Sequence, residues 1–173
     1  VGVVKPAARD AVSTTKTNKI GVIGTRGTIG SGVYERELKA LKPGVEVITQ
    51  ACPLLVSIAE EGMGDSEVAR LTTKQYLKVF EGTGIDTLIL GCTHYPLLRN
   101  VIQEIVGKSV TLIDSAKPTA EELKQILEEK ELLNDGKPTD NKFFVTDAPE
   151  RVFEIADNFL GRKVIPSLEK VEM

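Results

Sequence analysis

Short apolar runs recur along the chain, and each ends in small or polar residues. The clearest runs cover residues 20–24, 87–90, 110–113 and 143–145, with a further candidate at residues 45–48. The runs show almost no alternation of apolar and polar positions, which is typical of strands in a parallel sheet covered on both faces. We therefore predict that they form parallel β-strands. The apolar residues 1–4 are also predicted to form a buried strand.

Amphipathic segments with helical spacing lie between the predicted strands. They cover residues 31–41, 66–80, 96–106, 119–133 and 150–160. The segment 119–133 is expected to begin at a capping box, in which Thr119 is followed by Glu122, and the turn-rich residues 134–141 predict a surface loop. Strands that alternate with helices predict the α/β class, in which ligands bind beyond the carboxyl ends of the strands.

Composition narrows the class of protein further. The chain has 173 residues, of which 41% are apolar and 27% charged, enough for one ordinary globular domain or one and a half small ones. A net charge of −3 argues against a nucleic-acid partner. No apolar run approaches the roughly 18 residues that a bilayer requires, so no membrane partner is expected. Two cysteines do not make a disulfide scaffold, which favours a reducing, cytoplasmic location.

The most informative stretch is LILGCTHYPLL, residues 88–98. An apolar strand ends at a glycine and is followed by the thiol of Cys92, a hydroxyl and the imidazole of His94. Pro96 suits the first turn of a helix, and the positive end of a helix dipole favours a thiolate nearby. We therefore expect Cys92 to carry chemistry, with His94 holding or relaying its proton. One histidine and no CxxC pair argue against a metal site.

Other polar groups near strand ends admit two interpretations each. The turn GTRGTIG at residues 24–30 presents Thr25 and Thr28, and it is either a plain turn or a site for a small carboxylate. It matches neither dinucleotide nor phosphate-loop motifs. Cys52 is expected to have a packing role, and Glu60 belongs by default to a solvated helix face. Asp114 could cap a helix as easily as contact a ligand.

The motif GCTHYPLL, residues 91–98, resembles the signature around the second catalytic cysteine of glutamate racemases, in the aspartate/glutamate racemase superfamily. The resemblance continues through KIGVIGT at 19–25, ACPLLV at 51–56, VTLIDS at 110–115 and FFVTD at 143–147. Related aspartate racemases tend to carry glutamate where this chain has His94, which favours glutamate as the substrate.

The resemblance implies a fold and a domain organisation. The family has two α/β domains with the active site between them, and the two ends of its chain combine to make one domain. Residues 1–114 look like the middle domain, a parallel-sheet three-layer α/β domain that carries GCTHYPLL. Residues 115–173 look like the C-terminal part of the split second domain. The family's N-terminal portion, with its first catalytic cysteine, has no counterpart here, so the chain looks like roughly the last two thirds of a racemase.

The resemblance also implies a mechanism, which is inversion at Cα by two thiols without a cofactor. Cys92 would be the base toward L-glutamate, assisted by His94, which Glu60 would orient. Thr93 and His94 match substrate-binding positions, and Thr25 and Thr28 are expected to donate to a substrate carboxylate. D-Glutamate supply for peptidoglycan and a homodimer follow from the same resemblance.

Two alternatives to a racemase remain open. One is a single-thiol, decarboxylase-like relative, which would need only one proton donor. The other is a non-catalytic module that binds a small acid or a protein.

Overall fold

The computed structural model describes residues 1–134, 136, 142–147, 149–160 and 168–172. They divide into two compact units, Val1–Leu133 and Asn134–Met173. The surface loop predicted at 134–141 lies almost entirely outside the described residues. Within the part of the chain that is described, every helix is too short or too polar to cross a membrane.

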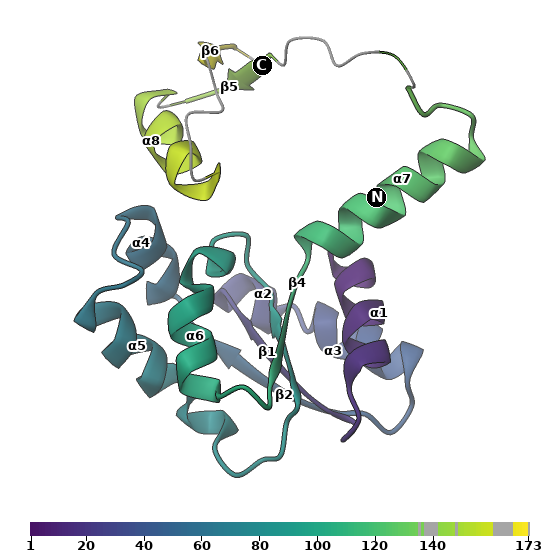
Figure 1. The fold of residues 1–173 in the computed structure, drawn as a ribbon, viewed down its shortest axis with the longest axis vertical. Coiled ribbons are helices and arrows are strands. Elements are labelled where there is room, and N and C mark those ends of the chain that lie inside the picture. Colours follow the sequence, from purple (N-terminus) through teal and green to yellow (C-terminus); the bar gives the residue numbers. More distant parts are fainter. Residues whose placement is uncertain (135, 137–141, 148, 161–167, 173) are drawn as a thin grey trace. The chain divides into compact units, whose positions relative to one another are not determined.

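A four-stranded sheet forms the centre of the first unit (Figure 1), with the strand order β2-β1-β3-β4. The strands are β1 (Lys19–Gly24), β2 (Glu46–Ala51), β3 (Thr87–Leu90) and β4 (Thr111–Asp114). All three neighbouring pairs are parallel. This was predicted from apolar runs in which apolar and polar positions do not alternate. The inner strand β3 is buried at every position, which explains why its sequence shows no polar face.

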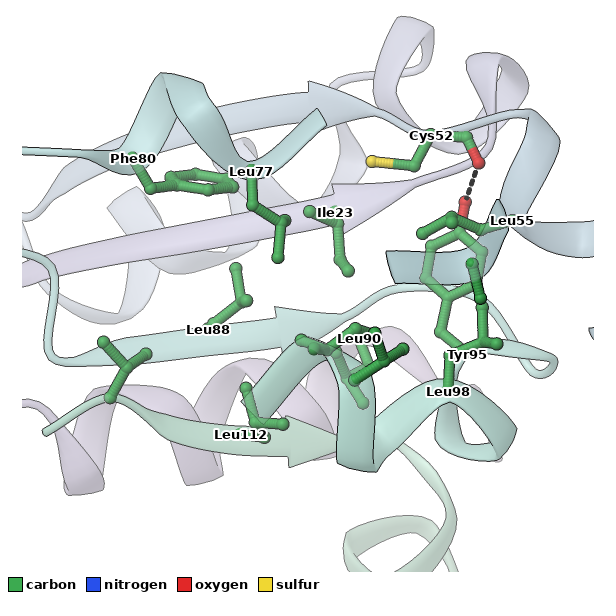
Figure 2. Close-up of a cluster of buried hydrophobic side chains, with 14 of the residues drawn as sticks. Ile23, Cys52, Leu55, Leu77, Phe80, Leu88, Leu90, Tyr95, Leu98 and Leu112 are labelled. Atoms are coloured by element: carbon green, nitrogen blue, oxygen red, sulfur yellow. Dashed lines mark hydrogen bonds between the residues drawn. The ribbon is translucent and has the colours of Figure 1, made fainter. Parts of the chain in front are cut away.

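Helices cover both faces of this sheet, which makes the predicted three-layer α/β arrangement. The helices of the first unit are α1 (Val4–Thr14), α2 (Arg26–Gly30), α3 (Val33–Leu41), α4 (Leu54–Glu60), α5 (Glu67–Leu77), α6 (Arg99–Val106) and α7 (Ala116–Glu129), with the 3₁₀ helices η1 (Lys78–Phe80) and η2 (Tyr95–Leu98). One face carries a buried cluster with side chains from α4, α5 and α6 (Figure 2). The other face is covered by α1 and α3.

The first element is a helix, so the strand predicted at residues 1–4 is wrong. The helix α1 begins at Val4, and its buried residues include Pro6, Ala7 and Ala8. Alanine has the highest helix propensity, and proline is tolerated in a first turn. A four-residue apolar run is too short for its pattern to distinguish a strand from the start of a helix.

Two helix starts also differ from the predicted positions. The helix α7 begins at Ala116, so Thr119 lies inside it and the predicted capping box is wrong. Asp114 instead accepts a hydrogen bond from the backbone N–H of Ala116 at 3.0 Å, which satisfies one amide at the helix start. The segment 31–41 forms a helix only from Val33, because Gly32 has a left-handed backbone with φ of +62°.

The second unit contains a parallel strand pair, β5 (Phe143–Val145) and β6 (Leu168–Lys170). The helix α8 (Pro149–Leu160) lies between them in the sequence, so the described part of this unit is a β-α-β arrangement. The strand at 143–145 and a helix at about 150–160 were predicted. The strand β6 was not, because its three residues include the charged Glu169 and Lys170.

Candidate functional site

The register of the sheet brings the carboxyl ends of its four strands to one edge. Gly24 of β1 lies beside Ala51 of β2, and Leu90 of β3 lies between Ile23 of β1 and Asp114 of β4. The turns that leave these strands carry the side chains that the sequence singled out. This edge is therefore where the candidate site is assembled.

Gly91 lets the turn that carries Cys92 lie directly on β1. Its backbone N–H donates to the carbonyl oxygen of Ile23 at 2.7 Å. A Cβ atom at this position would lie 2.8 Å from the same oxygen, which is closer than real Cβ atoms approach. The glycine is thus required by close backbone contact, and the thiol of Cys92 follows at a partly exposed position.

A chain of polar groups leads from the thiol of Cys92 to a carboxylate. The Sγ atom of Cys92 is 3.9 Å from Nδ1 of His94, and the hydroxyl of Thr93 is 3.2 Å from the same nitrogen. Nε2 of His94 lies 3.2 Å from Oε1 of Glu60 at the end of α4, and these two side chains are only 23% and 25% exposed. A carboxylate in this position fixes the imidazole ring and stabilises it when it is protonated. The arrangement suits proton transfer at Cys92.

Cys52 lies at the same edge but has a different environment. It is completely buried, and its thiol faces the core cluster and lies 3.6 Å from the carbonyl oxygen of Gln50 (Figure 2). Burial raises the pKa of the Cys52 thiol to about 12. A thiol that stays protonated and shielded from solvent is a poor acid–base group, which agrees with the packing role expected for it.

The turn after β1 is a helix cap. The hydroxyl of Thr25 accepts from the backbone N–H of Thr28 at 3.2 Å, and the two hydroxyls are 3.0 Å apart. Both side chains remain partly exposed. Thr25 therefore has a clear structural task, and the turn still presents two hydroxyls at the edge that carries Cys92.

Residues 1–123 match the Asp/Glu/Hydantoin racemase family. The chain belongs to this family. It is 48% identical over 165 residues to a glutamate racemase of Geobacter metallireducens, covering 95% of this chain and 61% of that relative. It is also similar to the crystal structure of glutamate racemase RacE1 from Bacillus anthracis, with a TM-score of 0.93, 42% identity, and coverage of 100% of this chain and 64% of that one.

A further solved relative is the glutamate racemase of Francisella tularensis in complex with D-glutamate. It matches with a TM-score of 0.89 and 34% identity over 98% of this chain and 62% of that one. These matches confirm the family resemblance and the α/β class predicted from the motifs. The chain spans about three fifths of the length of these relatives.

Two tyrosines were missed as site residues, one packed against the racemase-family motif and one within it. The ring of Tyr34 packs against Gly91, and burial, with a smaller effect of the Cys92 charge, raises the pKa of Tyr34. Tyr95 is completely buried, and its hydroxyl donates to the carbonyl oxygen of Cys52 at 2.8 Å (Figure 2). A buried tyrosine normally finds a partner for its hydroxyl, so Tyr95 within an apolar segment was the available signal.

The helix expected to start at Pro96 begins as a 3₁₀ helix. The regular helix α6 starts only at Arg99, after η2. Because the dipole effect fades within the first turn, the positive end of α6 contributes less at Cys92 than predicted. Among the described residues, no cluster of three or more His, Cys, Asp or Glu side chains could hold a metal ion.

Proposed function

We propose that the protein carrying this chain is a glutamate racemase, which interconverts L- and D-glutamate without a cofactor. The observation that carries the proposal is the line of polar groups from Cys92 through His94 to Glu60 at the carboxyl edge of the sheet. The similarity to the Geobacter glutamate racemase and to the Francisella structure that holds D-glutamate supports glutamate as the substrate.

The proposed chemistry is proton transfer at Cα on two opposite faces. The thiolate of Cys92 removes the α-proton of L-glutamate and becomes a thiol, and the electron pair stays on a planar, carbanion-like substrate. A second thiol protonates the opposite face to give D-glutamate, and the return reaction runs in reverse. Cys52 does not fit the role of that second thiol, because it is buried with a raised pKa. By the family resemblance, the second thiol belongs to the family's N-terminal portion.

The neighbouring groups have supporting roles in this proposal. His94 lies within reach of the Cys92 thiol and takes part in holding its proton, while Glu60 keeps the ring in place. Thr93, Thr25 and Thr28 are proposed to donate hydrogen bonds to the substrate carboxylates. An amino-acid α-proton is weakly acidic, so exclusion of water and fixed hydrogen bonds must supply much of the rate.

The wider context belongs to the same proposal. Residues 1–114 are proposed to be the middle domain of the racemase, and residues 115–173 the C-terminal part of its split second domain. The enzyme is proposed to be a homodimer that supplies D-glutamate for peptidoglycan. A catalytic thiol must stay reduced, which supports a cytoplasmic setting.

The test measures exchange and inversion at Cα in D₂O, with L- and D-glutamate supplied separately. It uses this chain alone and this chain fused behind the N-terminal portion of the Geobacter relative. In the fused protein we expect racemisation, which circular dichroism measures. We also expect deuterium to be incorporated into both enantiomers. For the chain alone, exchange limited to L-glutamate is the result expected of a half-site with one thiol.

Cys92→Ser is the matched control in both proteins, and far-ultraviolet circular dichroism spectra check that each variant folds. Loss of exchange in this variant assigns the base. Racemisation that survives Cys92→Ser would contradict the assignment of Cys92. A folded fusion protein that binds glutamate but neither racemises nor exchanges it would favour the non-catalytic binding module.

A further inference from the structure

The catalytic loop, residues 91–95, carries Cys92 and is attached at two points to α4 and the segment just before it. Nε2 of His94 lies 3.2 Å from Oε1 of Glu60, the last residue of α4. Next along the chain, the Tyr95 hydroxyl donates at 2.8 Å to the carbonyl oxygen of Cys52, just before α4 begins (Figure 2). The adjacent residues His94 and Tyr95 therefore contact the last residue of α4 and the segment just before its first residue.

The helix between these two contacts is short and well packed. It has 7 residues, and Leu55, Ile58 and Ala59 are buried against the sheet. A helix of this length spans on the order of 10 Å and bends little. The position of its first turn relative to the loop therefore determines where Glu60 stands relative to His94.

The Tyr95 hydroxyl is well suited to hold this arrangement. The side chain is completely buried, so its bond to the Cys52 carbonyl is shielded from competing water. The same carbonyl also accepts from the backbone N–H of Leu55 at 3.1 Å, in the first turn of α4. One oxygen atom thus joins the catalytic loop to the start of the helix that carries Glu60.

We propose that Tyr95 is a positioning residue, whose hydroxyl bond to Cys52 fixes the loop on α4 and thereby holds Glu60 opposite His94. The consequence for Cys92 rests on the proposed racemase function. The placement of the His94 ring does not depend on that function, and it can be observed in this chain without any turnover.

His94 gives a direct readout because it is the only histidine in the chain. Its ring nitrogen and carbon signals in an NMR spectrum of the labelled chain therefore identify themselves. We expect Tyr95→Phe to shift these signals in the same direction as Glu60→Gln. In the Glu60→Gln background the additional effect of Tyr95→Phe should nearly disappear, since both changes act on one contact. Additive shifts, or unchanged signals in Tyr95→Phe, would overturn the proposal.

Tyr76→Phe is the matched control. The hydroxyl of Tyr76 is 3.5 Å from the backbone nitrogen of Leu54, so it approaches the same end of α4 but from α5. This contact does not involve the Cys52 carbonyl, so removal of the Tyr76 hydroxyl should leave the His94 signals in place. A shift equal to that of Tyr95→Phe would mean that the loop contact has no special role.

If Tyr95→Phe does not fold, Pro53→Gly gives a second test. Pro53 precedes α4, and glycine there loosens the connection between the Cys52 carbonyl and the helix. We expect Pro53→Gly to shift the His94 signals in the same direction as Glu60→Gln, and unchanged signals would contradict the proposal.

Turnover supplies the second readout in the fused racemase. Tyr95→Phe should lower kcat about tenfold with little change in KM, because a small displacement near the reacting groups affects the transition state more than binding. An inactive fusion protein together with the expected His94 shifts would reject the racemase function and leave the positioning role intact. Normal kcat in Tyr95→Phe would reject the catalytic consequence.

Discussion

The backbone N–H of Gly91 donates to the carbonyl oxygen of Ile23 at 2.7 Å. This bond comes immediately after the ladder between β3 and β1, so the turn that carries Cys92 begins as an extension of the sheet. The thiol is thereby held directly after a strand that is buried at every position. A site built on a buried sheet is more precisely placed than one on a free loop.

Gly91→Ala should destabilise the protein by about 1–3 kcal/mol, because a methyl group there meets a backbone oxygen that cannot move without disturbing β1. The free energy of unfolding in urea measures the effect. Gly30→Ala is the control, since a Cβ atom at Gly30 has no atom within 4 Å. Its effect is expected to stay within about 0.5 kcal/mol. Equal losses in the two variants would refute the close-contact explanation.

The two cysteines should differ sharply toward iodoacetamide. At pH 8 the native chain is expected to gain one carbamidomethyl group, on Cys92, because Cys52 is buried and its pKa is raised to about 12. Mass spectrometry after brief treatment reads the number of groups. In Cys92→Ser no rapid labelling should occur, and in urea both thiols of the unchanged chain should react. Rapid labelling of Cys52 in the folded protein would contradict its buried position.

Glu60→Gln should reduce turnover of the fused racemase by roughly tenfold to a hundredfold, because the amide cannot stabilise a protonated His94 as a carboxylate does. The change should fall mainly on kcat, which steady-state kinetics with both enantiomers measures. Glu61→Gln is the control, as it changes the exposed neighbouring carboxylate. A similar loss in both variants would point to a general electrostatic effect instead of the contact with His94.

Asp86 should make the stability of the first unit depend on pH. Its burial favours a higher pKa, but hydrogen bonds from Thr15 and Thr87 and from the backbone of Lys16 and Thr17 prevail and lower the pKa to about 2. In the unfolded chain an aspartate has a pKa near 3.9. The folded form therefore gains stability that is complete above about pH 4 and is lost as the pH falls toward 2.

Asp86→Asn tests this dependence. The variant should lose on the order of 1 kcal/mol at pH 7, after allowance for solvent screening, and its deficit should shrink at pH 2 to 3. Urea unfolding of both proteins at several pH values measures the difference. A deficit that stays constant with pH would show that shape and packing, and not the charge of Asp86, stabilise this junction.

The sequence predicted the sheet because inner strands of a parallel sheet are covered on both faces. Residues 87–90 are apolar without alternation, and all four are buried. The same reasoning located Cys92, since groups that follow parallel strands meet at one edge. Short-range signals at helix ends were less informative. Thr119 and Glu122 have the spacing of a capping box, but Pro118 and the Asp114 side chain allow α7 to begin three residues earlier.

The contacts that complete the site depend on residues far apart in the chain. The Glu60 side chain belonged by its local pattern to a solvated face, and only the resemblance suggested a contact with His94. Tyr95 and Cys52 are 43 positions apart, and their hydrogen bond needs the packing of η2 against α4. No local pattern encodes such a pair, so the candidate thiol could be predicted from the sequence, but the contacts that support it could not.

In the first unit, the parallel register also separates the carboxyl ends of the strands, which carry the candidate site, from their amino ends. The turns at the amino ends of the strands include exposed glycines with left-handed backbones, such as Gly44, Gly82 and Gly84, and none of the candidate site residues lies there. Exposed turns of this kind accept extra residues more readily than other positions. A fluorescent tag or affinity peptide inserted at Pro43–Gly44 would therefore stand at the end of the first unit opposite Cys92, and random insertions that leave Cys92 reactive should accumulate there.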